Sequence, residues 1–152
     1  MFYMGSDCLK ISAKSRYALA ALTYMGQNCN ANDTITVLAL SEKLGISKIY
    51  LEQVFSLLRR GDIVISIKGA QGGYRLAKSS SDITVFDILS AIEMSMFEKT
   101  ESTVAKTAEN IERVMFDTIF DVLDKKVREI LSAITLEDIV KKSEQTDYMY
   151  YL

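Results

Sequence analysis

The chain contains no histidine, no proline and no tryptophan, and only two of its 152 residues are cysteines. Without histidine it lacks the commonest general base, the most frequent zinc ligand and the side chain that titrates nearest neutral pH. Cys8 and Cys29 are too few and too far apart for a disulfide framework or a metal knuckle. No pairing of nucleophile and base and no phosphate loop is visible. These absences argue against an enzyme and predict no metal and no cofactor.

Long apolar runs and a secretion signal are also missing. No run approaches the roughly 20 residues that a membrane span requires. The opening MFYMGSDCL has neither the positive start nor the apolar stretch of about 7 to 15 residues that a signal peptide needs. We therefore expect a cytoplasmic protein without a membrane partner. Residues 1–9 also precede the first recognisable motif, so the true start could be Leu9, and Cys8 would then carry no meaning.

Charge is divided unevenly along the chain. Residues 1–80 hold 10 Lys and Arg against 5 Asp and Glu, a net of +5, whereas residues 81–152 hold 8 against 15, a net of −7, which together give the overall −2. Such a division predicts a front half that binds a polyanion and a rear half that faces something else.

Polar caps and glycines divide the start of the chain into helices. The spacing of apolar residues predicts a helix over residues 12–27 that begins at Ser12, and a second over residues 36–44 that ends at Gly45. The intervening CNANDT is polar and predicts a loop.

A third helix is predicted to begin at Ser47 as its N-cap and to end at Gly61. Its expected apolar face consists of Ile49, Leu51, Val54, Phe55 and Leu58. Two short helices joined by a tight turn with glycine are typical of a helix-turn-helix.

The period then changes to two. Ile63, Ile65 and Ile67 alternate with other residues before the turn GAQGG, which predicts a two-stranded hairpin. A hairpin directly behind a helix-turn-helix is a wing.

The rear half is predicted to be helical. A helix over residues 84–94 would begin at Asp82 or Thr84, the pattern lapses over 94–102, and one amphipathic helix follows from about residue 104 to 133. A helix of that length extends beyond a small domain, so its apolar stripe needs a partner, most economically a second copy of the chain.

A closing helix is predicted over residues 135–142, with Thr135 as its cap. An aromatic tail follows over 143–152, and we expect it to dock on another surface. The expected fold class is mainly α with a small β-hairpin wing. The expected domains are a winged helix-turn-helix over 10–93, a dimerisation helix and closing helix over 94–142, and the tail over 143–152.

Three groups of residues are candidates for binding double-stranded DNA. Side chains on the first turns of a recognition helix read bases and contact phosphates, and a wing tip can enter the minor groove. The start of the first helix can hold a phosphate with its amides and cations. The wing glycines either approach DNA closely or only serve the turn, and Tyr17 is expected in the core. The candidates are Ser12, Lys14, Arg16, Ser47, Lys48, Tyr50, Gln53, Lys68, Gly69, Gln71, Gly72 and Gly73.

Three ordered blocks carry a resemblance to a known family. KISAKSRYALAALTYMG, LSEKLGISKIYLEQVFSLLRRGDIVISIKGAQGGYRLA and ITVFDILSAIE resemble the Rrf2 family of bacterial winged helix-turn-helix transcription regulators. The match runs from about Lys10 to Glu93, and the long helix and the TLEDI segment extend it over nearly the whole chain. The resemblance implies a regulator, more specifically a repressor, that binds a palindromic operator as a homodimer.

The best-known sensors of that family hold an iron–sulfur cluster with three cysteines placed after the helix that ends near Glu93. Residues 93–152 contain no cysteine, and thiolates are the usual cluster ligands. The chain is therefore similar to the cluster-free branch typified by the cysteine-metabolism repressor. That resemblance implies control of cysteine or sulfur metabolism, with the enzyme cysteine synthase as a partner.

Other interpretations stay open at this point. The winged helix could dock a protein in place of DNA, or a ligand pocket between the wing and the long helix could make the chain a regulator that responds to a small molecule. Cys29 as a redox sensor is less favoured, because a reactive thiolate needs cationic neighbours and Asn28 and Asn30 flank it.

Overall fold

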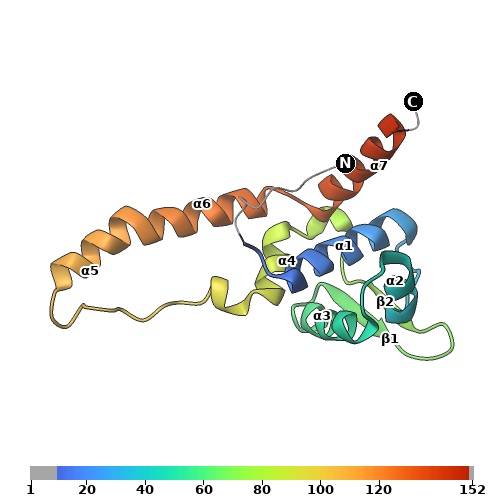
Figure 1. Ribbon diagram of the computed structural model, residues 1–152, viewed down its shortest axis with the longest axis horizontal. Coiled ribbons are helices and arrows are strands. Elements are labelled where there is room, and N and C mark those ends of the chain that lie inside the picture. Colours follow the sequence, from blue (N-terminus) through green and yellow to red (C-terminus); the bar gives the residue numbers. More distant parts are fainter. Residues whose placement is uncertain (1–9, 151–152) are drawn as a thin grey trace.

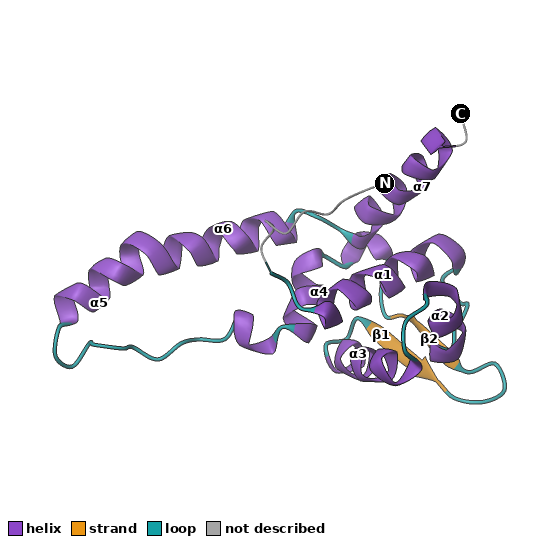
Figure 2. Ribbon diagram, viewed as in Figure 1, coloured by secondary structure: helices purple, strands orange, loops and turns teal. Residues whose placement is uncertain are grey.

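A computed structural model describes residues 10–150 of the chain (Figure 1). Helices dominate it, and one antiparallel hairpin lies among them (Figure 2). The elements in chain order are α1 (Ala13–Asn28), α2 (Val37–Leu44), α3 (Lys48–Arg60), β1 (Val64–Ile67), β2 (Gly73–Leu76), η1 (Ser80–Asp82), α4 (Val85–Ile92), η2 (Met94–Met96), α5 (Glu109–Met115), η3 (Phe116–Phe120), α6 (Asp121–Ser132) and α7 (Leu136–Tyr150).

The predicted starts of the first two helices are confirmed by their capping bonds. The Ser12 hydroxyl accepts a hydrogen bond from the Ser15 amide at 3.2 Å, and the Thr36 hydroxyl accepts one from the Ala39 amide at 3.1 Å. Gly45 ends α2 with a φ of 65°, a left-handed conformation that glycine adopts without steric cost. The two caps and the terminal glycine therefore lie where the sequence predicts them.

The expected details of α3 are partly wrong. Ser47 occupies the N-cap position but makes no side-chain cap bond, and Ile49 is 70% exposed instead of joining the apolar face. Gly61 has an ordinary φ of −87°, and the positive φ falls on Asp62 at 56°. Glycine is needed at 61 for a different reason, because a Cβ there would lie 2.6 Å from the Cβ of Ala91 on α4.

The hairpin forms as predicted and is tied to the chain before α2. β1 and β2 are antiparallel, with Val64 opposite Leu76 and Ile67 opposite Gly73. Ile35 adds an isolated bridge to Tyr74, with the Ile35 amide 2.9 Å from the Tyr74 oxygen and the reverse bond at 2.8 Å. The wing is therefore anchored on both sides of the helix-turn-helix.

Thr84 is the N-cap of α4, which settles the choice left open between Asp82 and Thr84. The Thr84 hydroxyl accepts a bond from the Asp87 amide at 3.1 Å, and the Asp87 carboxylate accepts one from the Thr84 amide at 2.9 Å. Asp82 instead ends the short turn η1. This reciprocal capping box satisfies two helix-end amides.

Helices α1 to α4, the hairpin and the start of α7 enclose one core, which we call the body. Its largest fully buried side chains are Phe55, Leu22, Met25, Leu40, Leu51, Leu58, Ile83, Ile88, Leu89, Leu136, Val54 and Val64. They come from almost every element of the body, so the elements stabilise one another.

The long helix is confirmed as one rod but starts later than expected. It begins at Glu109, not at about Val104, and it consists of α5, the single π-helical stretch η3 and α6. We call Glu109–Ser132 the arm. Figure 1 shows that the arm projects from the body and that the chain over residues 97–108 runs out alongside it.

The closing helix is longer than predicted and belongs to the body. Thr135 caps it as expected, with its hydroxyl accepting from the Asp138 amide at 3.1 Å. Leu136 is fully buried, and a Cβ at Gly26 would lie 2.6 Å from the Val140 side chain. α7 then continues to Tyr150, so the prediction that the helix ends at residue 142 is wrong.

Some expectations fall outside the described residues, namely those for residues 1–9, with Cys8 and the possible start at Leu9, and for the last two residues of the tail. Within residues 10–150, no helix is both long and apolar enough to cross a membrane.

Candidate nucleic-acid interface

The first turns of α3 present polar side chains to solvent while the opposite side of the helix is held in the core. Leu51, Val54, Phe55 and Leu58 are all fully buried. Ser47, Lys48 and Gln53 are exposed, and Tyr50 is half-buried. Because buried contacts fix the helix along its length, the exposed side chains are presented on a rigid support, as base reading requires.

Lys48 is paired only loosely. Its Nζ lies 3.5 Å from a Glu52 carboxylate oxygen, and both side chains are more than half exposed. An exposed pair of this kind contributes about 0 to 1 kcal/mol. A DNA phosphate can therefore replace Glu52 as the partner of Lys48 at little cost.

Tyr50 is held by a second tyrosine that the sequence interpretation placed in the core. Its ring meets the ring of Tyr17 edge to face, with centroids 5.2 Å apart and planes at 88°. Tyr17 is 37% exposed, so its predicted core position is wrong. Tyr17 is therefore a surface residue beside α3 that was not among the predicted site residues, although its place next to Arg16 in the RYAL motif was a usable signal.

Ile49 is a further residue that the sequence interpretation misplaced. It lies in the first turn of α3 between two candidate DNA contacts and is 70% exposed. An apolar side chain in that position can contact the methyl group of thymine.

The start of α1 is occupied by a carboxylate from α4. The Ser12 amide and the Ser15 hydroxyl donate to Glu93 Oε1 at 3.0 and 2.8 Å. These bonds, from Ser12 above all, hold the pKa of the Glu93 carboxyl below its usual value. The Ser12 hydroxyl and amide are thus both engaged inside the protein. Of the three residues predicted to contact phosphate at this end, Lys14, which is half-buried, and Arg16, which is exposed, have side chains that are not engaged in this contact.

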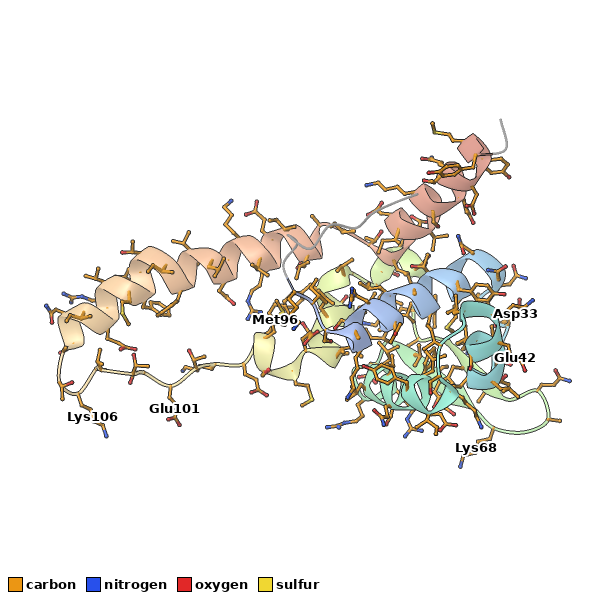
Figure 3. The ribbon with its side chains drawn as sticks, in the orientation of Figure 1. Asp33, Glu42, Lys68, Met96, Glu101 and Lys106 are labelled. Carbon is orange, nitrogen blue, oxygen red and sulfur yellow. The ribbon has the colours of Figure 1, made fainter. Side chains whose placement is uncertain are left out.

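The wing tip exposes Lys68, Gly69 and Gln71. In Figure 3 Lys68 points outward from the body. A Cβ at Gly72 would lie 2.6 Å from the Ile67 oxygen, and one at Gly73 would lie 2.6 Å from the Ile35 oxygen. The turn itself therefore requires glycine at 72, and the contact between β2 and Ile35 requires glycine at 73, whether or not the wing touches DNA.

The segment after α4, where cluster-bearing sensors carry cysteines, is organised by other groups. The Glu112 carboxylate accepts bonds from the Thr103 amide, the Thr103 hydroxyl and the Val104 amide at 3.1, 2.8 and 2.9 Å. At the start of this segment, far along the arm from Glu112, the Arg128 guanidinium lies over the rings of Phe86 and Phe97 at 5.2 and 5.6 Å.

These groups do not fit an iron–sulfur cluster, because none of them is a thiolate. In the part of the chain that the structure describes, no three His, Cys, Asp or Glu side chains are grouped to hold a metal ion.

A helix-turn-helix with an exposed polar recognition helix, followed by a two-stranded wing, defines a winged-helix DNA-binding protein. The sequence profile of the Rrf2 family, described as "Iron-dependent Transcriptional regulator", matches residues 11–142. The chain belongs to the Rrf2 family. It is a transcriptional regulator and not an enzyme.

Individual relatives agree with this assignment. The chain is 31% identical over 139 residues to the HTH-type transcriptional regulator IscR of Pectobacterium carotovorum, covering 91% of this chain and 84% of the relative. Among solved structures, IscR of T. potens is 32% identical with a TM-score of 0.70, covering 97% of this chain and 100% of the other. CymR, the global cysteine regulator of B. subtilis, is 31% identical with a TM-score of 0.64, covering 89% and 98%.

Proposed function

We propose that this regulator is a repressor that binds a palindromic operator as a homodimer. The observation that carries the proposal is the arm, which leaves a long apolar stripe open while the body is complete by itself. A second arm would cover the stripe and place two recognition helices on one DNA duplex.

The arm contains 24 residues, Glu109 to Ser132, and is about 36 Å long at 1.5 Å per residue. None of its side chains is buried. Eight large apolar side chains along it are each at least 50% exposed: Ile111, Val114, Phe116, Ile119, Phe120, Val122, Leu123 and Ile130. An apolar surface this extended is typical of an interface rather than of a solvated helix. A closed two-fold dimer is the simplest assembly that covers it.

Replacing Ile119 with aspartate tests the dimer. A charge at the centre of the covered stripe would lack a partner, so we expect the dissociation constant to rise at least a hundredfold in sedimentation equilibrium. Lys126→Glu is the matched control, since Lys126 is exposed and pairs with Glu129 within its own helix. A stable dimer in the Ile119→Asp variant would contradict the arm as the interface.

Two symmetry-related α3 helices predict two half-sites about one helical turn apart. Lys48, Tyr50 and Gln53 are the proposed reading residues, with Ser47 beside them. Lys14 and Arg16 are proposed to contact phosphate, and Ser12 to shape that end of α1. The wing is proposed to act through Lys68, Gly69, Gln71, Gly72 and Gly73.

Selection of bound sequences from random duplex DNA tests the operator. We expect a palindrome whose binding weakens steeply as salt rises, because phosphate contacts release counterions. Lys48→Ala should weaken binding without changing the dimer, whereas Lys106→Ala, on the loop beside the arm (Figure 3), should bind like the parent. No enriched sequence would contradict the proposal and favour a winged helix that docks a protein.

The process under control is proposed to be cysteine or sulfur metabolism, with cysteine synthase as the partner. The support is the 31% identity to the cysteine regulator CymR and the lack of any cysteine from residue 93 onward. Running the DNA selection with and without added cysteine synthase tests this. A palindrome that depends on the synthase would support it, and one that is unaffected would overturn it.

A further inference from the structure

Two adjoining hollows lie on the side of the hairpin that faces away from α3. They measure about 460 and 600 Å³, and small-molecule sites commonly fall within about 300 to 1,000 Å³. Both are bounded by the hairpin on one side and by the loop over residues 29–34 on the other. We call them together the cleft behind the wing. The cleft is separate from the arm, so the earlier expectation of a pocket between the wing and the long helix does not describe it.

The hairpin contributes two apolar side chains to the cleft. Ile65 lines one hollow and Ile67 the other, and both are half-buried. The register pairs Ile65 with Arg75, and residues opposite each other in a hairpin share one face. Tyr74, on the other face, packs against Phe55 of α3 at 4.9 Å between ring centroids. The face with Ile65 and Arg75 is therefore the one turned to the cleft.

Opposite charges line the cleft without neutralising each other. Arg75 and Asp33 border both hollows. Arg75 is half-buried, and within residues 10–150 its side chain has no hydrogen bond or ion pair. Asp33 uses one carboxylate oxygen to accept from the amide and the side chain of Asn30 at 2.8 and 3.0 Å. Asp33 is exposed, and its other oxygen accepts no hydrogen bond within residues 10–150.

The remaining lining groups are neutral or add positive charge. Lys78, Ser79 and Ser80 border the first hollow beside Arg75. Cys29 borders both hollows, and burial, with a smaller contribution from Asp33, raises the pKa of its thiol. Cys29 therefore lines the cleft as a protonated, polarizable thiol and not as a reactive thiolate.

We infer that the cleft behind the wing binds an α-amino acid with an apolar side chain. Arg75 and Lys78 would bind its carboxylate, the free Asp33 oxygen would accept from its ammonium group, and its side chain would lie on Ile65 and Ile67. A zwitterion offers one group of opposite sign to Arg75 and one to Asp33, which neither a simple anion nor a simple cation does.

The cleft is connected to the DNA-binding elements through its own walls. The Thr34 hydroxyl donates to the Gln71 oxygen at the wing tip at 2.7 Å, and the Ile35–Tyr74 bridge follows directly. α2 begins two residues later, at Val37. An amino acid that joins the loop to the hairpin would fix the wing relative to α3 and change DNA affinity. This consequence rests on the proposed function, whereas the binding itself does not.

Titration calorimetry of the full chain with L-leucine and L-methionine tests the binding. We expect saturable binding of at least one of them, and no binding of N-acetyl-L-leucine, which lacks the ammonium charge, or of L-leucinol, which lacks the carboxylate. Arg75→Gln should weaken binding about tenfold or more, since a charge-assisted hydrogen bond is lost. Lys106→Gln removes the same charge far from the cleft and should leave binding unchanged.

Lys78→Gln guards against a folding defect in the Arg75 variant, because Lys78 is exposed and its replacement should weaken binding without affecting the fold. The absence of saturable binding to either amino acid at about 10 mM ligand, a concentration that would fill a site with a dissociation constant of about 1 mM, would overturn the inference. The inference would also be overturned if N-acetyl-L-leucine and L-leucinol bound as tightly as L-leucine. DNA affinity measured with and without the amino acid is a separate readout, so a failure of the operator proposal would not be mistaken for a failure of the site.

Discussion

The body and the arm use similar apolar residues in opposite ways. In the body, leucines and isoleucines such as Leu22, Leu58 and Ile88 are completely buried. In the arm, Ile119 and Leu123 are 52% and 59% exposed, and no arm side chain is buried. The body therefore has the contacts that it needs within one chain, whereas the arm has them only if another chain supplies them. A pattern of apolar residues shows that a face will be covered but not by which chain.

Burial in the body should make its residues far more costly to remove than their counterparts in the arm. We expect Leu136→Ala to lower the free energy of unfolding by about 2 to 5 kcal/mol, as for other fully buried leucines. Leu123→Ala is the matched change in the arm, and its cost should depend on protein concentration, because it acts through association. Urea unfolding at two concentrations measures both. A cost for Leu136→Ala below about 1 kcal/mol would show that α7 is not part of the body.

The attachment of the wing should be the next most sensitive feature. Gly73 has a φ of 148°, and a Cβ there would lie 2.6 Å from the Ile35 oxygen, so Gly73→Ala adds a backbone clash to a strained conformation. We expect a loss of about 2 to 3 kcal/mol, against about 1 kcal/mol for Gly45→Ala. Gly45 also has a positive φ but has open space around it. Thermal unfolding measures both losses. If Gly73→Ala cost no more than Gly45→Ala, the wing would have to move away from Ile35 easily.

The carboxylate that joins α4 to α1 should make the body sensitive to acid. The folded pKa of Glu93 is lowered, so its contribution is complete above the unfolded value of about 4.3 and is lost as pH falls through the folded value. Glu93→Gln should cost about 1 to 2 kcal/mol at pH 7, and the difference from the parent should shrink at pH 3. Glu42→Gln, at an exposed surface position, is the control. A difference that is equal at both pH values would contradict the linkage.

The smallest effect is expected on the loop beside the arm. Glu112→Ala removes the acceptor for the Thr103 and Val104 amides. We expect these two amides to exchange with solvent faster while exchange in the body is unchanged. Glu109→Ala, one turn away and exposed, should not alter them. Unchanged exchange in the Glu112 variant would show that the arm orders this loop by other contacts.

The parts of the fold that depend on near neighbours were predicted well. Ser12, Thr36 and Thr135 cap their helices through bonds to amides three residues away, so each start is encoded within one turn. The wing followed from a change of period and a run of glycines. Ser47 is the exception, because its cap bond does not form and the helix is held by its buried face instead.

The candidate site was predicted less completely, because contacts over long distances in sequence decide exposure. Glu93 meets Ser12 across 81 residues, and no local pattern indicated that it would occupy the start of α1. Tyr17 and Ile49 have helical spacing suited to a core, yet the number of apolar positions that the core accepts depends on how the helices cross. The cleft behind the wing likewise exists only where the 29–34 loop meets the hairpin.

The sequence by itself determined the winged helix-turn-helix, the length of the arm to within a turn or two and the absence of cluster ligands after Glu93. It could do so because capping, periodicity and ligand chemistry are local properties. Only the tertiary structure decided that α7 packs on α1 and so belongs to the body, that Gly61 is needed for the contact with Ala91, and that Arg75 and Asp33 line one cleft without forming an ion pair with each other. Each of these depends on which surfaces pack against each other, and the free energy of that packing comes from residues far apart in the chain.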